Sequence, residues 1–240
     1  MTARISASGL GIKFLFDHER RVVTPAVARL RRRGAEVWGL RDVGVELRGG
    51  EGVALLGPSG SGKTTLLRVL GRIYYPDAGS LVIEGRVASL LSVDAGLLTL
   101  LTGRENAQLL LVLAGHSRRR VRSELEQVEE RSRLGASFDR PVSSYSQGMR
   151  ARLGFAVADR SDPDILLLDE VHEALDHEFR EIVRHRAEEI IAAGGIVVAA
   201  GHDHPLLAQI CTRAVFLSGG VVQTVGPFEE VQRTYLDQVA

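Results

Sequence analysis

Apolar residues follow two alternating patterns along the chain. Three short continuous runs, Val53 to Leu56, Ile165 to Leu168 and Ile196 to Ala200, have the length and composition of strands buried on both faces of a parallel sheet. Two of these runs are followed by apolar residues at helical spacing, namely Leu66, Leu67, Val69, Leu70 and Ile73, and Phe179, Ile182, Val183, Ala187, Ile190 and Ile191. Alternating strands and helices predict an α/β fold with a mainly parallel sheet and with ligands at the carboxyl ends of its strands.

The two ends of the chain predict further strands. An alternating, partly aromatic run covers residues 5–16, and a second strand is expected from Trp38 to Leu47. The arginine-rich insertion between them, residues 17–36, is interpreted as a solvated linker or helix face in preference to a contact for lipid headgroups. Residues 214–225 predict a strand hairpin, and a closing helix is expected from Pro227.

The middle of the chain, from Asp94 to about Arg140, is charged and helical in character, and it predicts a helical subdomain inserted into the α/β core. The stretch Ser143 to Arg150 then opens a helix, in which Ser144 and Gln147 stand at capping-box spacing. The apolar face of this helix is formed by Met149, Leu153, Ala156 and Val157. Ser146 and Gly148 also make it a helix N-terminus that can hold an anion.

Composition narrows the class of protein. A chain of 240 residues with 45% apolar residues can bury a substantial core, and its 30 basic and 30 acidic residues argue neither for nucleic-acid binding nor for adhesion to an anionic membrane. The lone cysteine, Cys211, excludes an internal disulfide framework. Because no run of about 18 apolar residues occurs, no membrane span is expected.

The stretch Gly57 to Thr65 carries the most specific chemistry. It matches the pattern GxxxxGK[ST] between an apolar strand and a helix start, an arrangement in which backbone N–H groups and the helix dipole point at phosphate oxygens. Lys63 is one of only two lysines, the other being Lys13, in a chain whose remaining 28 basic residues are arginines. A retained lysine indicates a place where a compact ammonium fits and a broad guanidinium does not. We expect Lys63 at the β- and γ-phosphates and the Thr64 hydroxyl on a magnesium ion.

Two acidic residues end the strand Ile165 to Leu168. Asp169 is placed beside the phosphate loop, where it would hold Mg²⁺ directly or through water. Its neighbour Glu170 points differently and could act as the general base that orients the attacking water. With the helix start at Ser146, the chain therefore offers two phosphate-facing helix N-termini and one pair of acids.

Five stretches together resemble the nucleotide-binding subunit of ATP-binding cassette (ABC) transporters. In the order typical of that family they are Gly57 to Thr65 as Walker A, Tyr145-Ser146-Gln147-Gly148-Met149 as a variant of the LSGGQ signature, Ile165 to Glu170 as Walker B, Ala174-Leu175-Asp176 as the D-loop, and His202 as the switch histidine. The resemblance covers essentially the whole chain. It implies a phosphate-loop ATPase core with a mainly parallel sheet, an antiparallel β subdomain and an inserted α-helical subdomain.

The resemblance also implies a domain organisation and roles for single residues. Residues 1–240 would form one cassette, with the core and β subdomain in 1–93 and 160–240 and the helical subdomain in about 94–159. No carbohydrate-binding domain is expected after Ala240. ATP would be bound by Phe14, with Phe16 as the alternative adenine-stacking ring, and by Gly57, Pro58, Ser59, Gly60, Ser61, Gly62, Lys63, Thr64 and Thr65. Thr64 and Asp169 would hold Mg²⁺, while Glu170, His202 and Lys63 would be catalytic.

In the family two copies close head to tail around two ATP molecules. Ser146, Gln147 and Gly148 would then reach the γ-phosphate held by the partner, with Asp176 in the D-loop. The sequence departs from the family in lacking a Q-loop glutamine, for which Asp94, as a metal ligand, or Ser92 would substitute. Glycine also stands before His202 where Ser or Thr is usual.

Within the family, Leu101 to Asn106, the YSQGM signature and the stretch Asp203 to Gly226 resemble the exporters of O-antigen, capsule, galactan and teichoic-acid glycans. The implied function is ATP hydrolysis that drives a separate membrane permease at the cytoplasmic face of the plasma membrane, with the glycan handled by the permease and no nucleic acid bound. Residues 97–102 are the expected docking place for that permease. The alternatives are a generic exporter of lipid or drug, a soluble ABC ATPase acting on nucleic acid or ribosomes, and a regulatory module that holds ATP without cleaving it.

Overall fold

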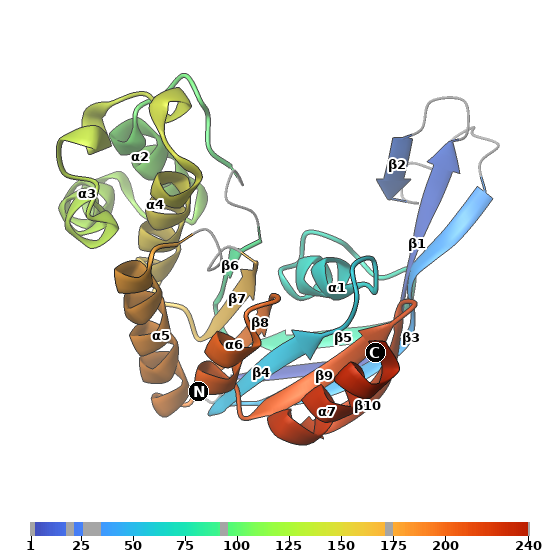
Figure 1. The fold of residues 1–240 in the computed structure, drawn as a ribbon. Coiled ribbons are helices and arrows are strands. Elements are labelled where there is room, and N and C mark those ends of the chain that lie inside the picture. Colours follow the sequence, from blue (N-terminus) through green and yellow to red (C-terminus); the bar gives the residue numbers. More distant parts are fainter. Residues whose placement is uncertain (1–2, 18–21, 26–34, 92–95, 171–174, 240) are drawn as a thin grey trace.

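The computed structural model describes residues 3–17, 22–25, 35–91, 96–170 and 175–239 (Figure 1). The strands are β1 (Arg4–Asp17), β2 (Val22–Pro25), β3 (Ala35–Arg48), β4 (Glu51–Leu56), β5 (Ala78–Glu84), β6 (Val87–Leu90), β7 (Ile165–Asp169), β8 (Ile196–Ala200), β9 (Arg213–Ser218) and β10 (Val221–Pro227). The helices are α1 (Lys63–Leu70), α2 (Gly103–Leu113), α3 (Arg118–Ser132), α4 (Gln147–Asp159), α5 (His177–Ala192), α6 (His204–Ile210) and α7 (Phe228–Val239), with the 3₁₀ turns η2 (Gly135–Asp139) and η3 (Val142–Ser144).

The larger sheet confirms the predicted α/β fold. Its strand order is β10-β9-β4-β8-β7-β6, and only β10 runs antiparallel to its neighbour. β4, β7 and β8 are the three continuous apolar runs, and they are buried as two-sided packing requires. Because these strands are parallel, the ends of β4, β7 and β8 lie at one edge of the sheet, which brings the residues after Leu56, Leu168 and Ala200 to the same side.

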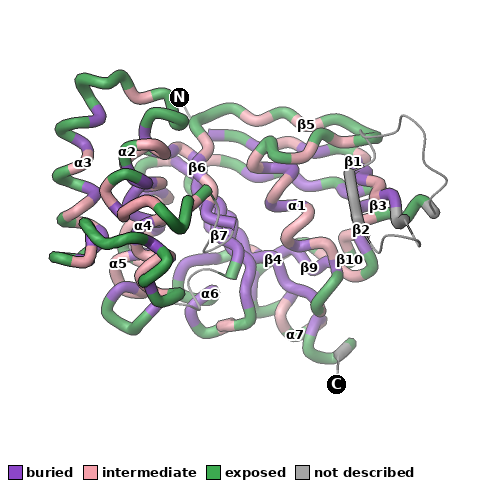
Figure 2. Tube along the Cα trace, turned by 90° about the horizontal axis from the view of Figure 1, so that it is seen from above, coloured by how far each residue is buried: buried purple, intermediate pink, exposed green. Residues whose placement is uncertain are grey.

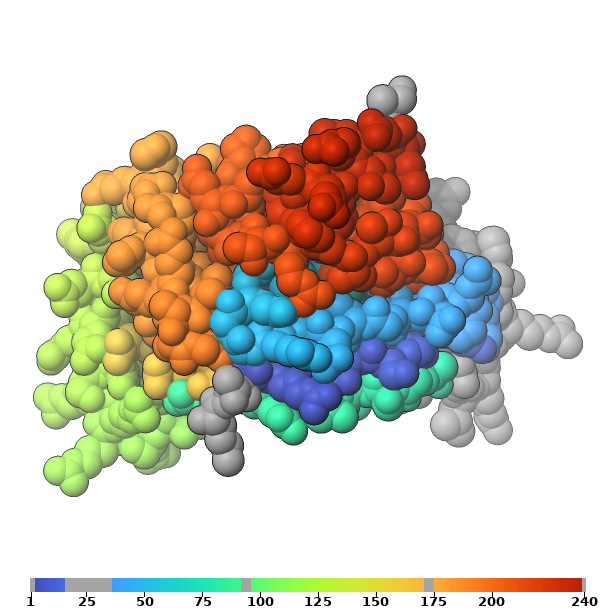
Figure 3. Space-filling view, turned by 90° about the horizontal axis from the view of Figure 1, so that it is seen from below, coloured from blue at the N-terminus to red at the C-terminus, as the bar shows by residue number. Residues whose placement is uncertain are grey.

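Each face of this sheet is covered differently. One face packs against α5, α6 and α7 in a cluster that includes Phe179, Leu207 and Val231, and the C-terminal part of the chain, orange to red, covers this side in Figure 3. The other face packs against α1, whose Leu66 and Leu70 share one buried cluster with residues of a second, antiparallel sheet. In the second sheet β1 pairs with β2, β3 and β5. The helix that begins at the phosphate loop therefore packs against both sheets.

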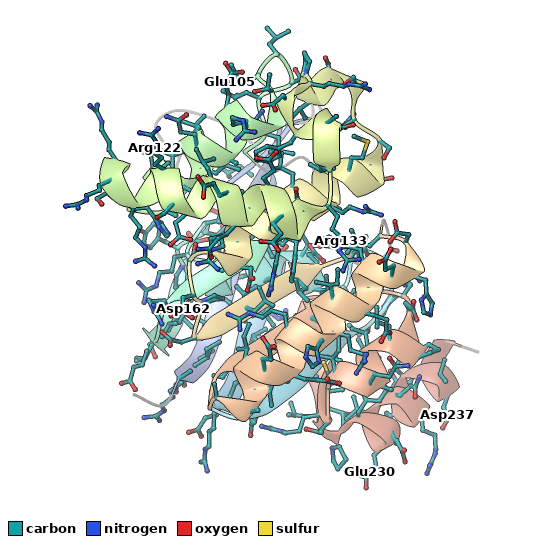
Figure 4. All side chains as sticks on the ribbon, turned by 90° about the vertical axis from the view of Figure 1, so that its left-hand side faces the viewer. Glu105, Arg122, Arg133, Asp162, Glu230 and Asp237 are labelled. Carbon is teal, nitrogen blue, oxygen red and sulfur yellow. The ribbon has the colours of Figure 1, made fainter. Side chains whose placement is uncertain are left out.

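The helices α2, α3 and α4 form a separate lobe with its own core, including Leu111, Val128 and Phe138. In Figure 2 the central strands are purple for burial, whereas much of α3 is exposed and green. Ion pairs join this lobe to α5, since Arg133 contacts Glu178 and lies at the junction in Figure 4. The buried carboxylate of Asp159 at the end of α4 accepts from Arg186 of α5 and also pairs with Arg131 of α3.

Three expectations about the elements are wrong. The insertion 17–36, interpreted as a solvated linker or helix face, contains a strand, β2, which pairs antiparallel with β1. The helix after the phosphate loop ends at Leu70, because Arg72 adopts a left-handed conformation at φ 57°, and this leaves Ile73 exposed outside the helix.

Of the helices formed by the described residues, none has the length and apolar character needed to cross a bilayer.

The third wrong expectation concerns the start of α4. Tyr145 and Ser146 are extended, so the first helical residue is Gln147 and the N-cap is Ser146, whose Oγ accepts from the Met149 N–H at 3.2 Å. Ser144 belongs to η3, and its hydroxyl donates to the Pro141 carbonyl at 2.7 Å. The predicted Ser144 and Gln147 capping box is therefore absent. A capping box does open α2, where Thr102 and Glu105 bond reciprocally.

Candidate nucleotide-binding site

The phosphate loop lies between the end of β4 and the start of α1. Gly57 has φ 146°, and a Cβ there would lie 2.2 Å from the Leu217 carbonyl oxygen and 2.7 Å from Ser61 Oγ. Only glycine fits this approach to β9. Ser61 is 2% exposed, and its Oγ has no hydrogen-bond partner among the described residues. The loop thus presents a buried polar group with unused bonding capacity, as a phosphate cradle requires.

Lys63 is the first residue of α1 and is 6% exposed. Its Nζ donates to the Gly57 carbonyl at 2.6 Å and to the Pro58 carbonyl at 3.2 Å. The Lys63 ammonium therefore lies inside the loop, against the same stretch of backbone that would surround a bound phosphate group. This compact enclosure gives a physical reason for lysine in a chain that otherwise uses arginine.

Thr64 and Asp169 are 105 positions apart in the sequence and meet at this loop, where Asp169 accepts a hydrogen bond from the Thr64 side chain. Asp169 is 7% exposed at the end of β7. Burial raises the pKa of Asp169 above its ordinary value, and the charge of Glu170 adds to this against the opposing hydrogen bond from Thr64. Its Oδ1 is buried and has no hydrogen-bond partner in the described part of the chain.

A buried carboxylate oxygen without a partner, next to a threonine hydroxyl, fits a divalent cation. Both groups offer hard oxygen ligands, which Mg²⁺ prefers, and the ion would neutralise a carboxylate whose burial is otherwise costly. Asp94, the further expected metal ligand, and Ser92 lie outside the described residues.

Glu170 follows Asp169 in a left-handed conformation, at φ 56°, which a non-glycine residue adopts only when its surroundings hold it there. Its N–H donates to the Ala200 carbonyl of β8 at 2.8 Å. The side chain, half exposed, lies with Oε1 at 3.4 Å from His202 Nε2. The turn thus places the Glu170 carboxylate beside the histidine after β8, so the expected base and the expected switch histidine are neighbours.

The second helix start lies elsewhere. Ser146 and Gln147 are exposed at the N-terminus of α4, and the Tyr145 ring beneath them is buried with its hydroxyl donating to the Ser137 carbonyl at 2.7 Å. In Figure 1 α4 stands in the helical lobe, apart from α1. One chain therefore does not bring Ser146 to Gly148 together with the phosphate loop.

The expected adenine-stacking ring, Phe14, is half buried on β1. Its ring meets Tyr74 edge to face with centroids 5.8 Å apart, and it covers Gly39, where a Cβ would lie 2.3 Å from Phe14 Cε2. Gly39 in turn abuts the phosphate loop, since a Cβ on Gly62 would lie 3.1 Å from the Gly39 carbonyl oxygen. Phe14 is thus placed beside the loop. The side chain of Phe16 lies outside the described residues.

Asp176 of the expected D-loop is the N-cap of α5, and its Oδ1 accepts from the Phe179 N–H at 2.9 Å. Its other carboxylate oxygen pairs with Arg152 of α4, which sequence reasoning missed. The sequence gives only a weak indication of this pairing, namely that the basic Arg152 stands between the apolar Ala151 and Leu153. Tyr74 beside Phe14 was also missed, because it lies in the stretch that was expected to be the end of the helix, whereas α1 ends at Leu70.

A family model described as "ABC transporter" matches residues 40–173, more than half of the chain. The chain belongs to the ABC transporter family. This chain is accordingly an ABC ATPase, which binds and hydrolyses ATP.

Relatives of this ABC chain include proteins named as O-antigen and teichoic-acid exporter subunits. The O-antigen export system ATP-binding protein RfbB of Klebsiella pneumoniae is 34% identical over 232 residues, which are 97% of this chain and 92% of the relative. A protein of the same name from Myxococcus xanthus is 34% identical over 88% of this chain, which spans about half of that relative (48%). The teichoic acids export ATP-binding protein TagH of Listeria innocua is 33% identical over 82% of this chain and 59% of its own length.

Solved structures share the fold of this ABC chain. A dimeric structure of MJ0796, described as a bacterial ABC transporter cassette, superposes with a TM-score of 0.75 over 93% of this chain and 98% of its own, at 22% identity. At this level of identity the likeness concerns the fold alone.

Proposed function

We propose that this chain is the ATP-hydrolysing subunit of an ABC exporter that moves a lipid-linked polysaccharide of the O-antigen, galactan or teichoic-acid type through a separate permease. One observation supports the ATPase part of this proposal. Lys63, Thr64 and Asp169 come together at the phosphate loop, where Lys63 and Asp169 are buried. The names of relatives that match 97% and 82% of this chain support the substrate class. The chain would act at the cytoplasmic face of the plasma membrane, attached through the permease.

Each residue of the loop has a task in this proposal. The Lys63 ammonium and the loop amides offset the phosphate charge, while Thr64 and Asp169 hold Mg²⁺. When bound, Mg²⁺ supplies further positive charge at the phosphates. Glu170 accepts a proton from the attacking water, and His202, 3.4 Å from it, contacts the γ-phosphate and responds to its loss.

The exposed start of α4 supports a homodimer. Ser146 and Gly148 form an anion-binding helix N-terminus on the surface, and nothing in the same chain's phosphate loop contacts it among the described residues. Two copies placed head to tail would bring each α4 start to the ATP held by the other copy. The MJ0796 cassette, which shares this fold, is dimeric in its solved structure.

The permease would dock on the tip of the helical lobe. Leu98 and Leu100 are exposed in the segment before α2, with Leu100 at 88%, and Val112 and Leu113 are exposed at the other end of the same helix. The preceding loop is held rigid by the fully buried Asn106, whose Oδ1 accepts from the Leu98 N–H at 2.7 Å and whose Nδ2 donates to the Thr102 carbonyl at 2.9 Å. Rigid apolar side chains presented on such a loop suit a helix end of a membrane partner.

The decisive experiment depletes the protein in its native cell and identifies the lipid-linked glycan that accumulates inside. Copurification should yield a membrane protein, and Leu100→Asp should abolish that association while the isolated chain hydrolyses ATP at the normal rate. Val82→Asp is the matched control, since Val82 is also exposed but lies on β5 of the antiparallel sheet. Accumulation of a lipid or drug without a glycan would contradict the substrate class, and copurification with nucleic acid alone would contradict transport.

A further inference from the structure

The arginine Arg180 of α5 joins two segments that end at the catalytic edge of the sheet. Its Nε donates to the Leu175 carbonyl at 2.9 Å, and its Nη1 forms an ion pair with Asp203 Oδ2 at 3.4 Å. Leu175 precedes the α5 cap Asp176, while Asp203 directly follows His202. One side chain thus bonds to the backbone on the β7 side and to a carboxylate on the β8 side.

Asp203 is well placed to transmit this contact to His202. Its Oδ1 caps α6 by accepting from the Leu206 N–H at 3.1 Å, so the carboxylate is fixed on one side by the helix and on the other by Arg180. The backbone turns tightly here, with the His204 N–H donating to the His202 carbonyl at 3.0 Å. A shift of the Asp203 carboxylate therefore displaces the residue that carries the imidazole.

The chemistry of arginine suits this position. Both contacts use the planar guanidinium at once, which a lysine ammonium with the same reach cannot reproduce in a fixed geometry. Arg180 is about one-third exposed, and this partial burial strengthens the pair relative to a surface ion pair. Arg184, one turn further along α5, pairs only with Glu181 and Glu188 of its own helix within the described residues.

We propose that Arg180 is a positioning residue for ATP hydrolysis, which holds the His202 turn against the start of α5 so that the imidazole stays beside the Glu170 carboxylate. The inference rests on the roles proposed above for His202 and Glu170, which lie 3.4 Å apart. Arg180 contacts Leu175 and Asp203, and neither of these residues belongs to the phosphate loop, so its loss should act on turnover and leave nucleotide binding in place.

The test compares ATPase turnover with ATP affinity in the purified full chain. Arg180→Gln should lower kcat about tenfold or more, because misplacing a group by about 1 Å can cost up to about a hundredfold, while the Kd for ATP stays within about twofold. Arg180→Lys keeps the positive charge but loses the planar guanidinium that makes both contacts. Its kcat should therefore lie between those of Arg180→Gln and the wild type. The matched control Arg184→Gln removes an arginine from the same helix and should leave both kcat and Kd unchanged.

A double-mutant cycle separates positioning from a general loss of structure. Asp203→Asn keeps an oxygen that can cap α6 but removes the charge that pairs with Arg180. If the two residues act through one contact, the Arg180→Gln and Asp203→Asn double variant should be no slower than the worse single variant. Multiplicative losses, an unchanged kcat in Arg180→Gln, or a parallel loss of ATP affinity would each overturn the inference. Since the assay follows hydrolysis by the isolated chain, an error in the proposed glycan or permease would leave these outcomes untouched.

Discussion

The two helix starts that can hold a phosphate differ in how completely their own chain encloses them. At the start of α1 the side chains of Ser61 and Lys63 are buried, and Gly62 provides no side-chain cap, so the first N–H groups remain available to a ligand. At the start of α4 Ser146 and Gln147 are exposed, and the Ser146 hydroxyl already accepts from Met149. The first site is built around a ligand, and the second is a surface that another molecule must complete.

The difference follows from where each start lies in the fold. The α1 start is surrounded by β3, β7 and β9, which contribute Gly39, Asp169 and Leu217. The α4 start belongs to the helical lobe, and the residue that precedes its N-cap, Tyr145, is buried. We therefore regard one chain as carrying two unlike halves of a site, and the following experiments test how strongly the halves depend on each other.

The largest effect is expected from Glu170→Gln. The variant keeps the side-chain size and the left-handed turn but cannot accept the proton from water, so turnover should fall by about a hundredfold or more. ATP binding should persist, because the loop and the metal pair are unchanged. The measurement is steady-state hydrolysis together with size-exclusion chromatography in ATP, where a nucleotide-bound dimer should accumulate. Hydrolysis at the normal rate would exclude Glu170 as the base.

The next largest effects are expected from variants that disable the α1 start and the α4 start separately. Lys63→Ala removes the buried ammonium and should weaken ATP binding on the order of 10- to 100-fold, the cost of a charged hydrogen bond, whereas Lys13→Ala, a surface lysine paired with Glu36, should not. Gly148→Glu places negative charge at the α4 start and should slow hydrolysis while the single chain still binds ATP. Binding is measured by calorimetry and hydrolysis by phosphate release.

Mixing these two variants decides whether the halves belong to different chains. A mixed dimer contains one site in which both halves are intact, so Lys63→Ala and Gly148→Glu chains should regain activity together that neither has alone. An equimolar mixture that stays as inactive as its components would show that both helix starts serve the same chain's nucleotide.

The sequence predicts the α1 start well because its signals are local. The apolar run of β4, the glycines and Lys63 are contiguous, and Asp169 ends a recognisable strand. The meeting of Thr64 with Asp169 depends instead on the sheet order β4-β8-β7, which no local pattern encodes. For the same reason the partners of Asp176 and Asp203, which are Arg152 and Arg180, emerged only when the helices were placed in space.

Errors in the prediction cluster where backbone conformation decides the outcome. Ser144 and Ser146 are both suitable caps in the sequence, and the extended conformation of Tyr145 selects Ser146. Ile73 fits the helical pattern of α1, yet the left-handed Arg72 ends the helix before it. The arginine-rich composition of the insertion concealed the strand β2, since its four residues, Val22–Pro25, directly follow Arg20 and Arg21 and include a proline.

The smallest effect is expected on the thermal stability of the protein, through the buried Asp169 beside the α1 start. Burial raises the pKa of Asp169, so its charged form is less favourable in the folded than in the unfolded chain. The folded protein therefore gains stability from this group as pH falls through the raised pKa and loses it as pH rises. Asp169→Asn removes the buried charge and should raise the unfolding temperature of the metal-free protein by a few degrees, on the order of 1 kcal/mol for a chain of this size. The gain should be larger at pH 7.5 than at pH 5 and should shrink when Mg²⁺ and ATP stabilise the wild type, while hydrolysis is lost. Thermal unfolding in a chelator and in Mg²⁺-ATP measures this, and a destabilised variant in the chelator would mean that the carboxylate holds the fold without an ion.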